Sequence, residues 1–137
     1  MDVLDVHLAM RAALRAVEVC AEAGYQVGAS VVDRFGLEQV TLRGNMGGAH
    51  VAETARRKAW TAAGFRLPTS ELNGQAGEAL ASAATTVPGA VTLGGGLPIV
   101  AKSGALLGGI GVAGASSGEI DAKCARAGLD AIGEQLK

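Results

Sequence analysis

Aromatic residues make up only 3% of this 137-residue chain, and its formal net charge at pH 7 is -1. So few aromatic rings argue against a platform on which bases or sugars stack. A charge near zero gives no long-range attraction to nucleic acid or to an anionic membrane, so we expect neither partner. No apolar run reaches the roughly 18 residues that a membrane-spanning helix requires.

Cysteine is also scarce. Cys20 and Cys124 lie far apart in two expected helices, and their positions form neither a metal-ligand spacing nor a disulfide framework. We therefore expect both to be buried as small hydrophobic residues, and we expect no metal site. The first ten residues lack a cationic segment followed by an apolar core, so we expect no signal peptide and a cytoplasmic protein.

The strong catalytic signatures are missing as well. The chain has no P-loop sequence and no serine in a nucleophile elbow. The glycine run at residues 94–96 precedes an expected strand and not a helix, so it cannot hold a pyrophosphate at a helix N-terminus as a Rossmann loop does. No motif therefore identifies a reaction.

The chain does contain a regular pattern of apolar residues that is typical of a globular domain. With 49% hydrophobic and 18% charged residues, it is expected to fold as a single domain over residues 1–137. Periodicity predicts helices over residues 3–23, 49–65, 69–80 and from a Ser116 cap to about 136, a connector over 82–87, and strand pairs over 27–42 and 97–112. This order predicts an α+β domain, an antiparallel sheet flanked by helices.

Two details of the helices matter later. The helix over residues 3–23 carries residues at three- and four-residue steps that form one apolar stripe, the pattern of a face that packs on a core: Val6, Met10, Ala13, Leu14, Val17 and Ala21. Ser116 and Glu119 have the spacing of a capping box at the start of the last helix.

Three titratable residues are candidates for a site. His50 is expected at a helix N-terminus, where the neutral imidazole is favoured and can bind a metal or act as a base; a solvated helix start is the alternative. Lys58 lies beside a face of alanines and can reach inward as a base or Schiff-base nucleophile, or pair with a carboxylate such as Asp121 as a structural bridge. Asp121 suits the helix dipole and can also move protons.

Three segments together resemble a known family: ARRKAWTAAGFRLPT, GGGLPIVAKSGALLGGIGVAGA and GEIDAKCARAGLDAI, in this order. The chain resembles the GlcG/HbpS family of haem-binding-type proteins, and is similar to the C-terminal domain of PduO-type cobalamin adenosyltransferases. The resemblance implies a profilin-like α+β fold, homo-oligomers that are often octamers, and binding of haem or a corrinoid. The family pattern maps onto Lys58, residues 94–96, Gly109, Gly111 and Asp121. A role for His50 as haem ligand is a separate hypothesis.

These observations leave three functions open. The first is a small-molecule-binding protein whose oligomer holds haem, a corrinoid or another ligand. An anionic group of that ligand would accept hydrogen bonds from the amides of helix N-termini and of glycines. The expected ligand-binding residues are His50, Gly94, Gly95, Gly96 and Gly111. The second is a cofactor-free acid/base enzyme acting on a small organic acid or carbonyl compound, with Lys58, Asp121 and His50 as catalytic residues. The third is a structural oligomer or accessory subunit.

Overall fold

The structure is a computed structural model, and it describes residues 3–73 and 77–136. Its helices and strands are α1 (Val6–Glu22), β1 (Gly28–Asp33), β2 (Glu38–Arg43), α2 (Ala49–Phe65), η1 (Thr69–Asn73), α3 (Glu78–Thr85), β3 (Gly96–Val100), β4 (Leu106–Ala113), α4 (Gly118–Asp130) and η2 (Gly133–Gln135). The strands form one antiparallel sheet in the order β2-β1-β4-β3. This confirms the predicted profilin-like α+β fold.

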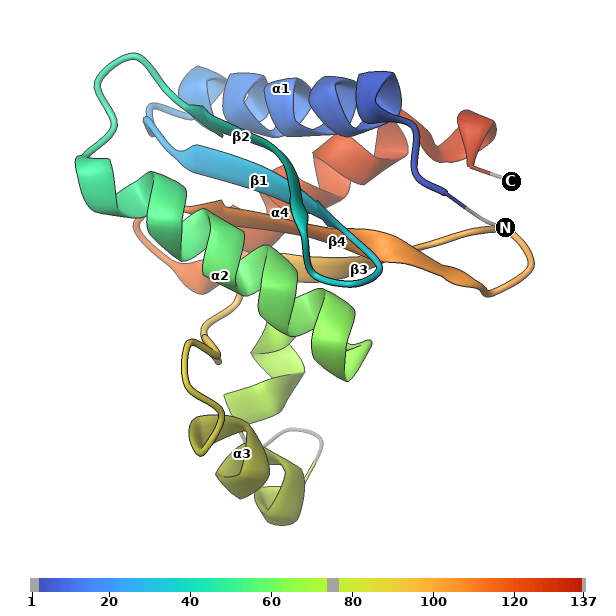
Figure 1. Cartoon of the computed structure of the whole chain (residues 1–137). Helices are drawn as coiled ribbons and strands as arrows, with labels where there is room; N and C mark the ends of the chain where they lie inside the picture. Colours follow the sequence, from blue (N-terminus) through green and yellow to red (C-terminus); the bar gives the residue numbers. More distant parts are fainter. Residues whose placement is uncertain (1–2, 74–76, 137) are drawn as a thin grey trace.

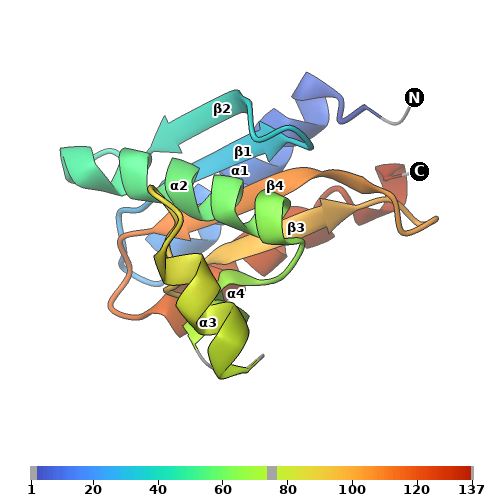
Figure 2. The same cartoon turned by 60° about the horizontal axis from the view of Figure 1, so that its bottom comes forward.

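The sheet lies between two layers of helices. α1 and α4 cover one face, and α2 crosses the other (Figure 1). The segment that contains η1 and α3 projects from this body, as a second view also shows (Figure 2). Among the described residues, no helix combines the length and apolar character that a membrane crossing requires.

Small residues bring α2 directly onto the sheet. A Cβ atom added at Gly111 of β4 would lie 2.1 Å from the Ala55 carbonyl oxygen of α2, and one added at Gly109 would lie 2.3 Å from the Ala59 oxygen. Both distances are shorter than any van der Waals contact. The glycines of β4 therefore serve close approach of a helix backbone to a strand backbone.

The predicted apolar face of α1 was wrong at most of its positions, although Ala13 is buried and Val17 packs against the core. The residues of α1 that are buried are Ala9, Ala12, Ala13, Ala16 and Cys20, whereas Val6, Met10 and Leu14 are 45%, 51% and 51% exposed. Alanines allow α1 to approach its neighbours more closely than larger residues would, as the packing of Gly128 in α4 against the Ala12 carbonyl shows. The smallest residues, and not the largest, therefore mark the core face of this helix.

The prediction that the cysteines form no disulfide was also wrong. Cys20 and Cys124 are both buried, as expected, but they are bonded to each other and join α1 to α4. The two residues are 104 positions apart, so only the side-by-side packing of these helices on one face of the sheet brings them together.

Replacing both Cys20 and Cys124 with alanine is expected to lower the free energy of unfolding by about 2–5 kcal/mol, because the cross-link closes a long loop and restricts the unfolded chain. Urea unfolding followed by circular dichroism measures this loss. The wild-type protein unfolded in a thiol reductant is the control, and it should match the double variant. Equal stability of the oxidised wild type and the double variant would show that the cystine contributes nothing.

Other bounds of helices also differ from the predictions. The segment expected as one helix over 69–80 forms η1 and then α3, with residues 74–76 outside the described residues. α3 continues through Thr85, where a connector was expected.

The last helix also begins and ends elsewhere than predicted. The cap of α4 is Ser117, one residue later than predicted, and its Oγ accepts a hydrogen bond from the Ile120 N–H at 3.2 Å. Ser116 Oγ instead lies 2.9 Å from the Tyr25 hydroxyl. The last helix ends at Asp130 and a short 3₁₀ turn follows.

Candidate functional site

A cavity of about 830 Å³ lies where the N-terminal ends of α2 and α4 meet the loop before β3. Its size is within the usual range for small-molecule sites. Four of the residues predicted from sequence line it: His50, Lys58, Gly94 and Asp121. Further polar side chains from α2, from η1 and from the start of α4 complete the wall: Thr54, Ser70, Asn73, Ser116, Ser117 and Glu119.

A buried ion pair forms part of this wall. Lys58 and Asp121 are 3% and 4% exposed, and the Lys58 Nζ atom donates to Asp121 Oδ2 at 3.1 Å and to the Val112 carbonyl at 3.0 Å. The other oxygen of Asp121 accepts a hydrogen bond from the Ala115 N–H at 3.0 Å. Lys58 therefore reaches inward from the alanine face of α2, and it is paired with the carboxylate named from the sequence.

The glycine before β3 makes room for this pair. Gly95 has a φ of +128°, and a Cβ atom there would lie 2.4 Å from the Val112 oxygen and 2.9 Å from Lys58 Nζ. A side chain at this position would thus collide with the carbonyl that Lys58 contacts, in a backbone conformation that favours glycine.

The other glycines predicted to bind a ligand have packing contacts. Gly96 lies against the Lys58 carbonyl, and its amide donates to Thr69 Oγ1 at 2.9 Å. Gly111 lies against α2, as described above. Gly94 packs against Gly118 at the start of α4 and also lines the cavity. Of the four glycines, the structure therefore places Gly94 at the cavity wall and Gly95, Gly96 and Gly111 behind it.

His50 is an exposed residue in the first turn of α2. Gly48, the N-cap of this helix, has no side chain to satisfy the first amides, and the His50 ring folds back over it. Within the described part of the chain, the His50 imidazole makes no hydrogen bond. The cavity thus combines a free imidazole with two helix N-termini, whose amides carry partial positive charge.

Comparison with known proteins identifies the family. The family model described as haem degrading protein HbpS-like matches residues 4–130. The chain belongs to the HbpS-like family. This confirms the resemblance inferred from the three sequence segments.

Two solved structures and one curated protein show how this HbpS-like chain relates to others. It is similar to a double mutant of Streptomyces reticuli HbpS, with 45% identity and a TM-score of 0.85 over 95% of this chain and 87% of that chain. It is similar to the PduOC complex with haem, with 31% identity and a TM-score of 0.82 over 95% of each chain. It is 37% identical over 131 residues to the corrinoid adenosyltransferase PduO of Salmonella typhimurium. This matched region covers 93% of this chain and 38% of that protein. The chain thus spans less than half the length of this curated relative.

Several residues that line the cavity of this HbpS-like chain were not predicted from the sequence. Ser70 and Asn73 belong to η1, which projects from the body and carries no motif. Ser117 is one residue from the predicted cap of the last helix. The cap pattern was the one sequence signal for a cavity residue, because the hydroxyl of a cap lies at the helix N-terminus that borders the cavity. The polar character of the wall therefore became visible only in three dimensions.

Proposed function

We propose that this chain binds haem in the cavity between the N-termini of α2 and α4, with His50 as the side chain that coordinates the iron. The matching family model is described as haem degrading protein HbpS-like, and the similar PduOC structure is a complex with haem. The observation that carries the proposal is the placement of His50, whose unbonded imidazole lines the cavity.

The residues present fit this cofactor in three respects. Neutral imidazole is the common protein ligand of haem iron. The amides at the starts of α2 and α4, with the hydroxyls of Ser116 and Ser117, can donate hydrogen bonds to propionate carboxylates. The cavity volume of about 830 Å³ accommodates a large planar ligand. When bound, the haem would supply redox chemistry at its iron, and the chain would hold and orient it.

Purified protein titrated with hemin tests this proposal. We expect a red-shifted Soret band that saturates at one hemin per chain, because coordination by an imidazole changes the electronic environment of the iron. A titration in which the spectrum stays that of free hemin would overturn the proposal.

A second candidate function is supported by the presence of Lys58, Asp121 and His50 in the lining of one cavity. These residues supply an amine, a carboxylate and an imidazole within one cavity, as acid/base turnover of a small organic acid or carbonyl compound requires. The hydrogen bond from Lys58 to Asp121 holds the amine in place, so this function predicts that turnover disappears when Lys58 is replaced.

Three other predictions stay with the proposal. The first is binding of a corrinoid, a second type of tetrapyrrole, in the same cavity. The second is assembly into a homo-oligomer, because the family resemblance implies homo-oligomers that are often octamers. The cytoplasmic location stays a prediction, and the Cys20–Cys124 cystine counts against it, because disulfides persist chiefly in oxidising compartments.

A further inference from the structure

We propose that the outer face of α2 carries a second ligand site, which binds a monocarboxylate with an apolar tail. Two cavities of about 240 Å³ and 250 Å³ lie there, and Trp60 lines both of them. We call the two cavities together the Trp60 site, and its lining residues are Arg56, Arg57, Trp60, Thr61, Gly64, Phe65, Val87, Pro88 and Gly89. None of these residues lines the cavity of about 830 Å³, so the proposal does not rest on haem binding.

The Trp60 site has two walls that come from different parts of the sequence. One wall is α2, whose lining residues recur at three- and four-residue steps and so share one face of the helix. The other wall is the segment 87–89, which follows α3. Thr61 connects them, because its Oγ1 accepts a hydrogen bond from the Val91 N–H at 3.0 Å and donates to the Arg57 carbonyl at 2.7 Å. Hydrogen bonds of the chain itself therefore hold the two walls together.

Trp60 is a surface aromatic residue that two glycines hold in position. A Cβ atom at Gly36, in the turn between β1 and β2, would lie 2.7 Å from Trp60 Cδ1, and one at Gly89 would lie 4.0 Å from Trp60 Cζ3. The chain has one tryptophan, one tyrosine and two phenylalanines. Trp60 and Phe65 are only partly buried and lie outside both clusters of buried core residues. Half of the few aromatic rings are therefore placed at one surface site, as is typical of binding sites.

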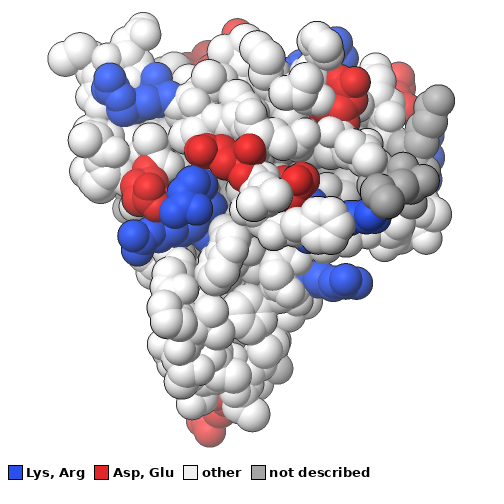
Figure 3. All heavy atoms as spheres, in the orientation of Figure 1, with Lys and Arg blue, Asp and Glu red and all other residues white. Residues whose placement is uncertain are grey.

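One end of the Trp60 site is cationic. Arg56 and Arg57 both contact the carboxylate of Glu53, the latter at 3.1 Å. Each guanidinium has five N–H donors, so one carboxylate cannot occupy the donors of both. Among the described residues, no acidic side chain lines either cavity. In the orientation of Figure 1, with α2 in front, the space-filling view shows basic side chains next to an acidic one (Figure 3). This end therefore offers free donors to an anion.

The other end of the Trp60 site is apolar. Trp60, Gly64, Phe65 and Val87 line it, and the hydroxyl of Thr61 is already engaged in two hydrogen bonds. A Cβ atom at Gly64 would meet no atom within 4 Å, so space is open there.

A monocarboxylate with an apolar tail matches both ends of the site. The carboxylate accepts charge-assisted hydrogen bonds from the arginines, and the tail is removed from water against the aromatic rings. A cation would match neither end, and an uncharged apolar molecule would match only one.

Titration with octanoate tests the proposal, because Trp60 is the one tryptophan and its fluorescence reports on the site directly. We expect a change in Trp60 emission that saturates. Octanol, which has the same tail without the charge, should bind at least about tenfold more weakly, because it cannot accept charge-assisted hydrogen bonds from two guanidinium groups. Emission that does not saturate, or equal binding of octanol, would overturn the proposal.

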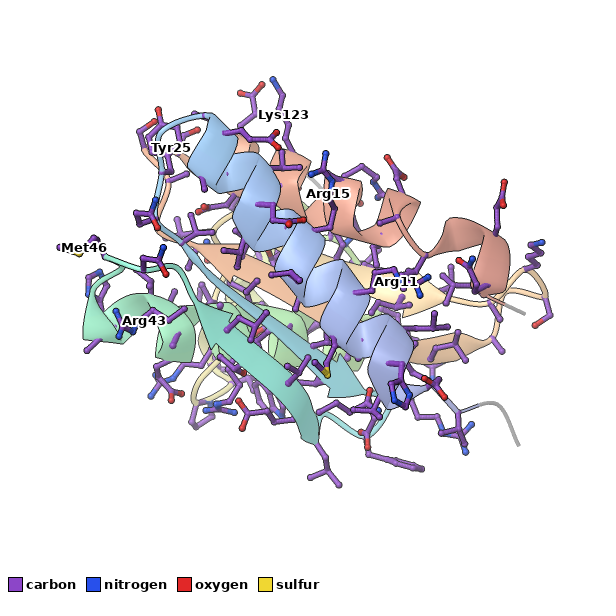
Figure 4. The ribbon with its side chains drawn as sticks, turned by 90° about the horizontal axis from the view of Figure 1, so that it is seen from above. Arg11, Arg15, Tyr25, Arg43, Met46 and Lys123 are labelled. Carbon is purple, nitrogen blue, oxygen red and sulfur yellow. A yellow bond between two sulfur atoms is a disulfide. The ribbon has the colours of Figure 1, made fainter. Side chains whose placement is uncertain are left out.

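A double variant tests the cationic end. Arg56→Gln with Arg57→Gln should raise the dissociation constant of octanoate by at least about tenfold. Arg11→Gln with Arg15→Gln is the matched control, because these two arginines lie on α1, across the sheet from α2 (Figure 4). The control should bind octanoate as wild type does. Binding by the Arg56 and Arg57 double variant that equals wild type would contradict the proposal.

A cavity-filling variant tests the apolar end. In the wild-type protein, affinity should rise about fourfold for each methylene group added between butanoate and octanoate. Gly64→Leu should remove most of this dependence, because the leucine occupies the space of the tail. Gly133→Leu is the control, since a Cβ atom there also meets no atom within 4 Å and Gly133 lies outside the site. Circular dichroism shows that both variants are folded. An unchanged dependence on tail length in Gly64→Leu would show that the tail lies elsewhere.

Discussion

Replacing Lys58 with methionine is expected to lower the free energy of unfolding by about 3–5 kcal/mol, because Asp121 would stay buried with its charge uncompensated. The pair is almost inaccessible to solvent, and Lys58 supplies the one cationic partner within 4.0 Å of Asp121 among the described residues. The Ala115 N–H would still bond one carboxylate oxygen, but a single amide does not replace an ammonium ion. Urea unfolding of the two proteins measures the difference.

The double variant Lys58→Met with Asp121→Asn is the control for this prediction. The asparagine keeps an oxygen that can accept from Ala115 and removes the unpaired charge, so most of the lost stability should return. A single variant as stable as wild type would show that the pairing of Lys58 with Asp121 contributes nothing to the free energy of unfolding. The double variant also separates the two candidate functions, because acid/base turnover should vanish while hemin binding through His50 persists.

Replacing His50 with alanine is expected to weaken hemin binding by at least about tenfold and to change the Soret maximum of what remains bound, because the iron loses its protein ligand. Isothermal or spectroscopic titration gives the affinity. His50 is exposed at a helix start, so the variant should fold normally and its effect on binding can be read directly.

The chain offers a matched control in its one other histidine. His7 lies at the start of α1, its side chain is 86% exposed, and its ring is 3.2 Å from Asp5 and outside the cavity. His7→Ala should bind hemin as wild type does. If both variants bind as wild type, or if His7→Ala shows the larger loss, His50 is not the ligand.

Local patterns predicted some elements well. The helix Ala49–Phe65 has the bounds expected from its sequence, because a glycine pair precedes it and Pro68 follows it. The inward position of Lys58 also followed from its place beside alanines. Such features depend on residues within a few positions of each other, so they can be predicted from one sequence alone.

Features that depend on distant contacts could not be predicted in this way. The buried face of α1 is decided by how closely α4 and the sheet approach, so large apolar residues misled the periodicity argument. The cystine joins residues with no local relation. The convergence of Lys58 and Asp121 was named only as one alternative, because 63 residues separate them and their meeting is a product of the fold.

The central claim is that haem lies between the N-termini of α2 and α4, and paramagnetic broadening of backbone amide signals tests its location most directly. Hemin added to ¹⁵N-labelled protein should broaden the signals of residues 50–51 and 117–119 first, because they border the cavity on both sides. Signals from the turn between β1 and β2 should stay sharp, since that turn contributes no residue to the cavity. Broadening centred on that turn, with the two helix starts unaffected, would contradict the account.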